Sequence, residues 1–373
     1  MKVLILTNHC GRLYLFRKLL LVRLLETHRV FVSVPEDAYT EPVKALGCEV
    51  IPCKLMDRRG INPLTEYQLY RHYQHLLQKI QPDIVLTYTI KSNIYGGYAC
   101  RKSGIPYLAT VTGLGSVFEG DGFFDRMMRR VVVMMYRAAM KECHCLFFQN
   151  EDNLKTFHKH GIYARKERLV NGSGVDLEEF SGTPMPVGGD GKTAPPVRFV
   201  FIARILREKG IEEYLSAAAR IKKKYPQTEF HVCGFKEKEY RGRLDKAVAK
   251  NIVIYHGERD DMPSFLKVIH CVALPSYHEG LSNVLLESAA SGRVLVTSDI
   301  PGCREAVEDG VTGFLIPPRD ANALADAMER FLSLSHEART EMGRQARQKM
   351  EREFDRRKVT DVYMKEINRW TTT

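Results

Sequence analysis

Short apolar runs alternate with longer helical stretches along the chain, and this alternation limits the possible folds more than any other feature. In the first half, the runs expected to be strands are residues 2–7, 30–34, 49–51, 84–87, 107–112 and 145–149. In the second half they are residues 198–202, 229–233, 252–255, 271–274, 294–297 and 313–316. Because strands that alternate with helices form βαβ units, the pattern predicts an α/β fold with two doubly wound parallel sheets.

A segment rich in glycine and proline, residues 181–196, interrupts this alternation and is expected to be a linker or an exposed loop. At 373 residues the chain exceeds the size of one ordinary core, so two domains are expected. We place them at residues 1–180 and 197–355. The charged segment 350–370 has apolar residues at helical spacing, which predicts a long helix. Residues 356–373 are expected to return to the first domain.

Positive charge is concentrated in the first half of the chain. The formal net charge is +11, and residues 1–150 hold 20 Lys/Arg against 12 Asp/Glu. A basic half favours an anionic partner, such as a nucleic acid, a phosphorylated substrate or an anionic membrane, although a solvated surface has the same composition. Segments 13–29 and 123–141 mix basic and apolar residues, as helices that lie on anionic membranes do. They could equally pack on the sheet. We expect peripheral contact with the inner face of the cell membrane.

The cysteines and the first residues favour the cytoplasm. The nine cysteines are spread singly except for Cys143 and Cys145, whose spacing is too short for a zinc site. Residues 1–8 lack the basic start and cleavage site of a signal peptide, and no apolar run reaches the roughly 20 residues of a membrane span. We therefore expect a cytoplasmic protein with reduced, mostly buried thiols.

Two glutamates, Glu279 and Glu287, lie eight positions apart, with Gly-Leu-Ser-Asn directly after the first. The expected strand 271–274 precedes them and a helix near 283–290 follows. Glu279 is therefore expected in a strand-to-helix loop and Glu287 inside the helix. Such a loop presents backbone N–H groups, and the helix dipole favours an anion there. Two carboxylates beside an anion site suit a nucleotide sugar, although each could be an ordinary surface acid.

Two basic residues follow the expected strand 198–202. Arg204 can donate to two oxygens of a diphosphate, and Lys209 supplies a point charge, so the two could neutralise a pyrophosphate leaving group. A solvated basic loop is the alternative. Ligands of doubly wound sheets bind beyond the carboxyl ends of the strands, which is where both cations and the two glutamates are expected.

Residues 279–287 resemble the E-x7-E signature of retaining GT-B glycosyltransferases of family 4. The likeness continues through residues 289–292, 299–302, 305, 309–310, 313–315 and 317. Residues 170–176 resemble the N-G-V-D segment that precedes the second domain in this family, here with two extra residues. The resemblance spans nearly the whole chain. It implies a GT-B fold, in which two Rossmann-like domains face a crevice and a C-terminal helix crosses back.

The resemblance also implies roles for individual residues. Glu279 would contact hydroxyls of the donor sugar, and Arg204 and Lys209 would hold its diphosphate, so these three form the expected catalytic set. Glu287 would accept hydrogen bonds from the ribose hydroxyls. The expected donor-binding residues are Gly11, Gly280, Leu281, Ser282, Asn283 and Glu287. Cationic side chains and helix dipoles would stabilise the departing nucleotide, so no metal and no other cofactor is expected.

The chain departs from the family pattern on the acceptor side. Many relatives carry a histidine near the reacting carbon, where this chain has Thr112. Many also carry a glycine pair after the first strand, where this chain has His9 and Cys10 ahead of Gly11. His9, Lys91 and Thr112 are the expected acceptor-side residues, and the identity of any general base stays open.

Residues 89–97 and 112–118 resemble a narrower group of enzymes, which extend undecaprenyl-diphosphate-linked sugars for surface glycans or protein N-glycosylation. In that group Lys91 would lie near the acceptor phosphate. The implied reaction moves a hexose or N-acetylhexosamine from a nucleoside-diphosphate sugar, expected to be UDP-linked, to a lipid-linked saccharide. Glu119 and Asp121 are the nearest match to a metal-binding Asp-x-Asp, and we expect them in an ordinary polar loop.

Two alternatives to this reaction remain. One is a nucleotide-sugar 2-epimerase of GT-B fold, which would turn over its substrate without an acceptor. The other is a non-enzymatic basic module that binds a membrane or nucleic acid, and it would show salt-sensitive binding with no affinity for nucleotide sugars. If the protein is a glycosyltransferase, no nucleic-acid partner is expected.

Overall fold

The computed structural model describes residues 1–56, 62–115, 118, 122–189 and 195–370. They form two compact units, one made of Met1–Ser173 with Arg356–Thr373 and the other of Gly174–Asp355. Some residues used in the predictions from sequence lie outside the described residues. They are residues 116–117, Glu119, Asp121 and residues 190–194 of the predicted linker. No helix of the described residues is long and apolar enough to cross a membrane.

The first unit is built on a seven-stranded parallel sheet with the order β3-β2-β1-β4-β5-β6-β7. The strands are β1 (Lys2–Leu6), β2 (Arg29–Val34), β3 (Glu49–Pro52), β4 (Ile84–Tyr88), β5 (Tyr107–Val111), β6 (Cys145–Phe148) and β7 (Glu167–Leu169). Every strand expected in this half is confirmed. The strand β7 was not predicted, because Glu-Arg-Leu is not an apolar run; it forms by pairing with β6, with Leu169 opposite Phe148.

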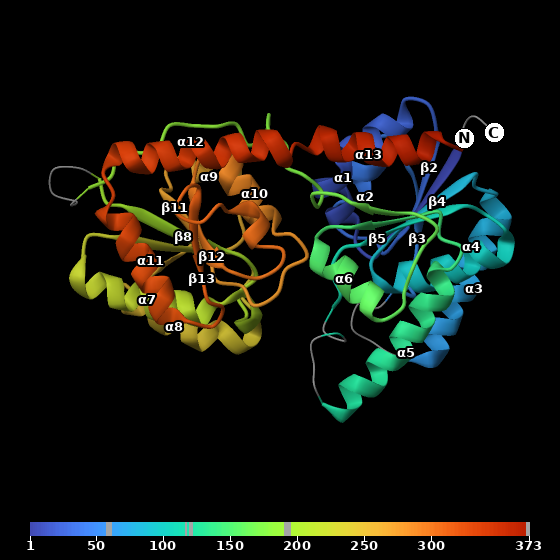
Figure 1. The fold of residues 1–373 in the computed structure, drawn as a ribbon, viewed down its shortest axis with the longest axis horizontal. Helices are drawn as coiled ribbons and strands as arrows, with labels where there is room; N and C mark the ends of the chain where they lie inside the picture. The colour runs from blue at the N-terminus through green and yellow to red at the C-terminus, as the bar shows by residue number, and fades with distance from the viewer. Residues whose placement is uncertain (57–61, 116–117, 119–121, 190–194, 371–373) are drawn as a thin grey trace. The chain divides into compact units, whose positions relative to one another are not determined.

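Helices cover both faces of this sheet (Figure 1). They are α1 (Cys10–Leu25), α2 (Thr40–Ala45), α3 (Pro63–Ile80), the π-helix η1 (Ser92–Gly96), α4 (Gly97–Ser103), α5 (Phe123–Met140), α6 (Glu151–Lys159) and α13 (Arg356–Asn368). Alternate residues of β1 enter different cores, as a strand requires. Leu4 and Leu6 belong to the core beneath α3, α4 and α5, while Val3 and Ile5 belong to the core beneath α1 and α13.

The C-terminal segment does return to the first unit, as the sequence predicted. Tyr363 of α13 stacks on Phe147 of β6 with 4.2 Å between ring centroids, and its hydroxyl lies 3.0 Å from Oγ1 of Thr110. The single long helix predicted over 350–370 is wrong. The helix α12 (His336–Glu353) ends before a break at Phe354, whose buried side chain joins the core of the second unit and whose carbonyl accepts from the Val175 amide at 2.8 Å.

The second unit contains a six-stranded parallel sheet with the order β10-β9-β8-β11-β12-β13. Its strands are β8 (Arg198–Ile202), β9 (Glu229–Cys233), β10 (Ile254–Tyr255), β11 (Cys271–Leu274), β12 (Val294–Ser298) and β13 (Gly313–Ile316). Its α-helices are α7 (Ile211–Lys224), α8 (Arg241–Ala249), α9 (Met262–Leu266), α10 (Asn283–Ala290), α11 (Ala321–Ser333) and α12. The short 3-10 helices are η3 (Arg207–Lys209), η4 (Lys238–Tyr240) and η5 (Arg304–Ala306).

A buried arginine, Arg293, joins several backbone segments of this unit. Its side chain has no exposed surface, and burial lowers its pKa to about 10. The guanidinium donates to the carbonyls of Ser291, Ile269 and Pro184 at 3.0, 3.1 and 3.0 Å, and to Oγ1 of Thr183 at 2.6 Å. These acceptors carry no charge, so the guanidinium is solvated by backbone dipoles and holds residues 183–184 in place.

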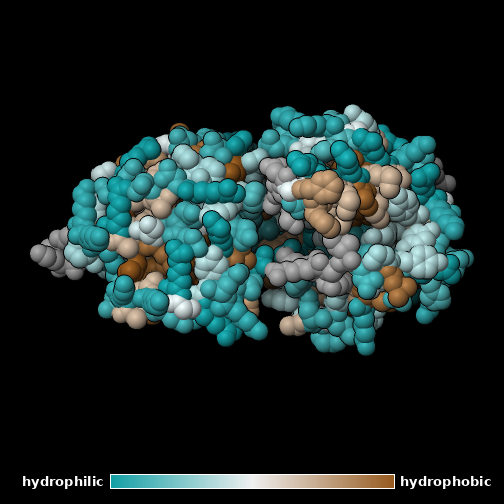
Figure 2. Space-filling view, turned by 90° about the horizontal axis from the view of Figure 1, so that it is seen from below, coloured by the Kyte–Doolittle hydropathy of each residue, from teal (hydrophilic) through white to brown (hydrophobic). Residues whose placement is uncertain are grey.

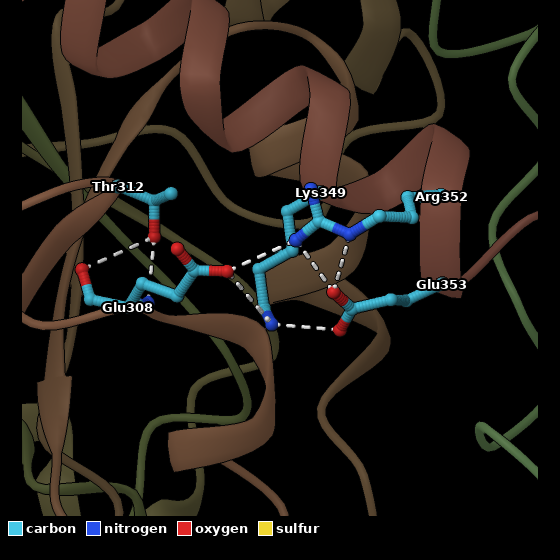
Figure 3. A network of polar contacts seen from close by, with 5 residues as sticks. All are labelled: Glu308, Thr312, Lys349, Arg352 and Glu353. Atoms are coloured by element: carbon cyan, nitrogen blue, oxygen red, sulfur yellow. Dashed lines mark hydrogen bonds and ion pairs between the residues drawn. The ribbon is translucent and has the colours of Figure 1, made fainter.

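A second polar network fixes the end of α12 (Figure 3). Arg352 and Lys349 of α12 point toward Glu308, with nitrogen–oxygen distances of 3.0 and 3.6 Å, and Lys349 also pairs with Glu353 at 2.7 Å. The Glu308 amide donates to Oγ1 of Thr312 at 2.8 Å. The turn between η5 and β13 is therefore tied to the last turn of α12.

Two buried histidines of the second unit give a pH prediction. Burial lowers the pKa of both His231 and His270 to about 4, from about 6.5 in an unfolded chain. Because the folded state disfavours the protonated rings, stability should be full above pH 6.5 and fall as the pH drops through 6.5 toward 4, by on the order of 3 kcal/mol for each residue. Urea unfolding of the protein at pH 7 and pH 5 measures this. The double variant His231→Gln, His270→Gln should flatten the slope, and an unchanged slope would contradict the assignment.

Candidate functional site

The carboxyl edge of the second sheet brings two predicted catalytic residues together. Lys209, in η3 after β8, places Nζ 2.5 Å from Oε1 of Glu279, in the loop between β11 and α10. The hydroxyl of Ser276 donates to the same carboxylate oxygen at 2.9 Å. Both side chains of the pair are mostly buried, with 20% of Lys209 and 14% of Glu279 exposed. A cation and a carboxylate from loops 70 residues apart thus form one polar centre.

Backbone contacts lock these two loops together. The Tyr277 amide donates to the Glu208 carbonyl at 2.8 Å, and the Tyr277 hydroxyl donates to Glu213 on α7 at 2.7 Å. The guanidinium of Arg319 lies 4.9 Å from the centre of the Tyr277 ring. The positions of Lys209 and Glu279 are therefore set by the packing around Tyr277 as well as by their own pairing.

The predicted donor-binding loop leads directly into α10. Ser282 precedes the helix with an extended backbone, and its amide donates to the Gly302 carbonyl at 2.9 Å. The Gly302 amide in turn donates to Oε2 of Glu305 at 2.7 Å. Gly280 and Leu281 lie in the loop, whereas Asn283 is the first residue of α10 and Glu287 lies one turn further along the helix.

Arg204 lies at the same sheet edge but has a different partner. It lies two residues after the end of β8, and its Nη1 lies 3.7 Å from Oε1 of Glu237, in the loop after β9. The structure therefore joins Lys209, but not Arg204, to Glu279. Burial raises the pKa of the neighbouring Cys303 thiol, and Glu279 raises it further, so this cysteine stays protonated.

A glycine between η3 and α7 permits the close approach of the two loops. Gly210 has a φ of +76°, and a Cβ at this position would lie 2.1 Å from the Pro275 carbonyl oxygen. We expect Gly210→Ala to push η3 off the loop after β11, to separate Lys209 from Glu279 and to lower any catalytic rate that needs this pair at least about tenfold. The control is Gly242→Ala on α8, where a Cβ meets no atom within 4 Å. Equal rates in steady-state assays of the two variants would contradict this prediction.

The acceptor-side residue His9 follows β1 in the first unit and lies beside an acid that the sequence reasoning missed. Its Nδ1 is 2.9 Å from Oδ2 of Asp37, a residue that follows β2. The amides of Gly11 and Tyr39 donate to the two oxygens of the same carboxylate at 3.0 and 2.8 Å. The signal was available, since residues that follow adjacent parallel strands meet at one sheet edge.

Gly11, predicted as a donor-binding residue, is buried in the first turn of α1. A Cβ there would lie 2.7 Å from the ring of Tyr39, so the missing side chain makes room for this ring. Thr112 directly follows β5 and precedes Gly113, whose φ is +141°. Within this unit, the two residues lie after the carboxyl ends of β1 and β5.

The third acceptor-side residue, Lys91, forms a buried ion pair. Its Nζ lies 2.5 Å from Oε1 of Glu66 on α3, and 20% and 10% of the two side chains are exposed. Lys91 stands between Thr89, whose φ of +76° is rare for a β-branched residue, and the π-helix η1. Positive φ values and π-helical turns are both enriched at functional sites.

Comparisons with known proteins agree with this architecture. Residues 191–349 match the family model described as Glycosyl transferases group 1, and residues 2–150 match the one described as Glycosyl transferase 4-like. Each half of the chain is therefore similar to a glycosyltransferase family. The two parallel sheets with flanking helices have the α/β GT-B fold, as the sequence predicted.

Individual relatives and solved structures are similar over most of the chain. A Campylobacter jejuni protein, N,N'-diacetylbacillosaminyl-diphospho-undecaprenol alpha-1,3-N-acetylgalactosaminyltransferase, is 28% identical over 87% of this chain and 88% of its own length. The Escherichia coli UDP-Gal:alpha-D-GlcNAc-diphosphoundecaprenol alpha-1,3-galactosyltransferase is 27% identical over 73% of this chain and 72% of its own. Anabaena HepE in complex with UDP has a TM-score of 0.79, with 18% identity over 99% of this chain and all of the other.

Proposed function

We propose that the protein is a retaining, metal-independent glycosyltransferase that moves a hexose or N-acetylhexosamine from a UDP-sugar to a polyprenyl-diphosphate-linked saccharide. The observation that carries the proposal is the pairing of Lys209 with Glu279 just ahead of α10. The names of the two relatives support the acceptor, since both act on undecaprenyl-diphosphate-linked sugars. The UDP complex of Anabaena HepE supports the nucleotide.

In the proposed reaction, the bond between the anomeric carbon and the β-phosphate oxygen breaks while the acceptor oxygen attacks from the same face. The acceptor proton passes to the leaving phosphate. Lys209, Arg204 and the amides at the start of α10 would neutralise the charge that develops on the diphosphate, which makes a metal unnecessary. Glu279 would accept hydrogen bonds from the donor sugar and Glu287 from the ribose.

The acceptor-side proposal involves His9, Lys91 and Thr112 of the first unit. Lys91 would approach an acceptor phosphate while Glu66 holds it in place. Asp37 would fix the ring of His9 beside the acceptor hydroxyl. A transferase needs such a site for a second substrate, whereas a 2-epimerase or a basic binding module does not.

The helix α5 supports contact with an anionic membrane. One face of α5 packs on the sheet through Val133, Tyr136, Ala139 and Met140, as the alternative to membrane contact predicted. The other face exposes apolar side chains, namely Phe123, Phe124, Met127, Val131 and Met134, beside the exposed Arg126, Arg130 and Arg137. Figure 2 shows hydrophobic patches interrupting a mainly hydrophilic surface. We propose that α5 holds the enzyme at the inner face of the cell membrane.

The membrane proposal predicts the effect of a double substitution. Phe123 and Phe124 are 75% and 73% exposed, and burying a phenylalanine in an apolar phase contributes about 1.5–3 kcal/mol. Phe123→Ser with Phe124→Ser should therefore weaken sedimentation with phosphatidylglycerol vesicles at least tenfold. The control is Val187→Ser, which removes a side chain that is 63% exposed in the second unit. Equal vesicle binding by both variants would rule out α5 as the contact.

One experiment tests the reaction itself. The protein is incubated with UDP-hexoses and UDP-N-acetylhexosamines, with and without a polyprenyl-diphosphate saccharide, in a metal-free buffer that contains EDTA. NMR of the product shows the anomeric configuration. We expect turnover only with the acceptor, and an α-linked product from an α-linked donor. Turnover without acceptor would indicate a 2-epimerase, a β-linked product would refute retention, and the absence of nucleotide-sugar binding would refute the donor assignment.

A further inference from the structure

A pocket of about 350 Å³ lies at the amino edge of the first sheet. Its walls come from the starts of β5, β6 and β7 and from the end of α13. The lining residues include His144, Arg165, Lys166, Glu366, Arg369 and Trp370. All strands of this sheet are parallel, so this edge is opposite the one at which His9 and Thr112 follow their strands. The pocket is therefore separate from the proposed acceptor site.

Positive charge dominates the walls of this pocket. Arg165, Lys166 and Arg369 are cationic, and among the described lining residues Glu366 is the one carboxylate. Glu366 accepts from Lys166 at 2.7 and 2.9 Å and from Arg369 at 2.8 Å. Burial lowers the pKa of His144, and the positive charge of Arg165 lowers it further. The local field therefore favours an added negative charge.

Arg165 is the lining cation best able to engage a ligand. It is 56% exposed and pairs with Glu142, outside the pocket lining, whose side chain is 36% exposed. Exposed ion pairs are weak, so Arg165 can exchange this partner for a bound anion. A guanidinium matches the geometry of phosphate oxygens, and the neighbouring Lys166 adds a point charge.

An aromatic wall stands beside these cations. The ring of Trp370 packs edge-to-face on His144 with 4.5 Å between the ring centroids, and Leu108 adds apolar surface. We propose that this pocket is a second ligand site, which binds a phosphate group on Arg165 and Lys166 and places the ring or chain attached to it against Trp370. Either a free small phosphate or a lipid headgroup supplies this chemistry.

Trp370 is the single tryptophan of the chain, so its fluorescence reports on this pocket. Titration of the full-length protein with inorganic phosphate should give a saturable change in emission, and Trp370→Phe should abolish the signal. Arg165→Ala should weaken binding at least tenfold. The matched control is Arg29→Ala, which removes an exposed arginine at the amino end of β2 that pairs with Glu49. Equal affinities of the two variants, with similar melting temperatures, would overturn the proposal.

A second titration distinguishes the two sources of phosphate. Vesicles of phosphatidylglycerol and of phosphatidylcholine are added to the protein that carries Phe123→Ser and Phe124→Ser, so that α5 does not contribute. Saturation with inorganic phosphate supports a free phosphate ligand, whereas a response to phosphatidylglycerol vesicles alone supports a lipid headgroup. The substitution Glu279→Ala should leave either response unchanged. No response to phosphate or to either vesicle would overturn the proposal.

Discussion

Replacing Glu279 by alanine is expected to lower the transfer rate by about 10²–10³-fold. The variant lacks the proposed acceptor for the donor sugar hydroxyls, and it leaves Lys209 without the carboxylate that now lies 2.5 Å from its Nζ. Because the two side chains form one centre, Lys209→Ala should add little to the loss in the double variant. Initial rates with saturating UDP-sugar and acceptor measure both effects.

The control for this experiment is Glu329→Ala. Glu329 also pairs with a lysine, Lys224, at 2.8 Å, but it lies on α11 away from the sheet edge that carries Glu279. We expect its rate to remain within twofold of the unmodified protein. A Glu279→Ala enzyme that melts normally and transfers sugar at the unmodified rate would remove Glu279 from the catalytic set.

Arg293→Met should have the largest effect on stability, on the order of 3–5 kcal/mol. The substitution keeps an apolar side chain of similar length but leaves the carbonyls of Ser291, Ile269 and Pro184 without the donor they share. Arg293→Lys should also destabilise, because one ammonium cannot reach acceptors spread around a planar guanidinium. Urea unfolding followed by circular dichroism gives both values.

Replacing an exposed arginine in the same way shows how much of the stability loss is due to the buried position of Arg293. Arg220→Met removes a guanidinium that is 43% exposed and pairs with Asp326, and exposed pairs contribute at most about 1 kcal/mol. If Arg293→Met cost no more than Arg220→Met, the backbone contacts of Arg293 would not stabilise the second unit.

The fold was predictable because the strongest local signals agree with the tertiary structure. Central strands such as β4 and β11 are continuous apolar runs, and their burial on both faces requires this composition. The strand β7 and the break at Phe354 gave no such signal. Leu169 pairs through its backbone, and Phe354 ends α12 because its side chain enters a core built by residues far away in the sequence.

The sequence predicted the sheet edge at which the candidate site lies, but not which side chains contact one another there. The sequence placed Lys209 and Glu279 after two strands of one sheet, yet their direct pairing depends on Gly210 and on the Tyr277 loop. It also missed Asp37 and Glu66. Asp37 was predictable, because it follows the strand next to that of His9. No local pattern records that α3 brings Glu66 to Lys91, 25 residues away.

The return of α13 has a consequence for synthesis on the ribosome. The first unit needs Arg356–Asn368, whereas the second unit is one continuous segment, Gly174–Asp355. The second unit can therefore fold before translation ends. The first unit stays incomplete until the last helix emerges, with the surface that Tyr363 and Ile367 later cover open to chaperones. Loss of residues 356–373 alone would damage the domain that is synthesised first.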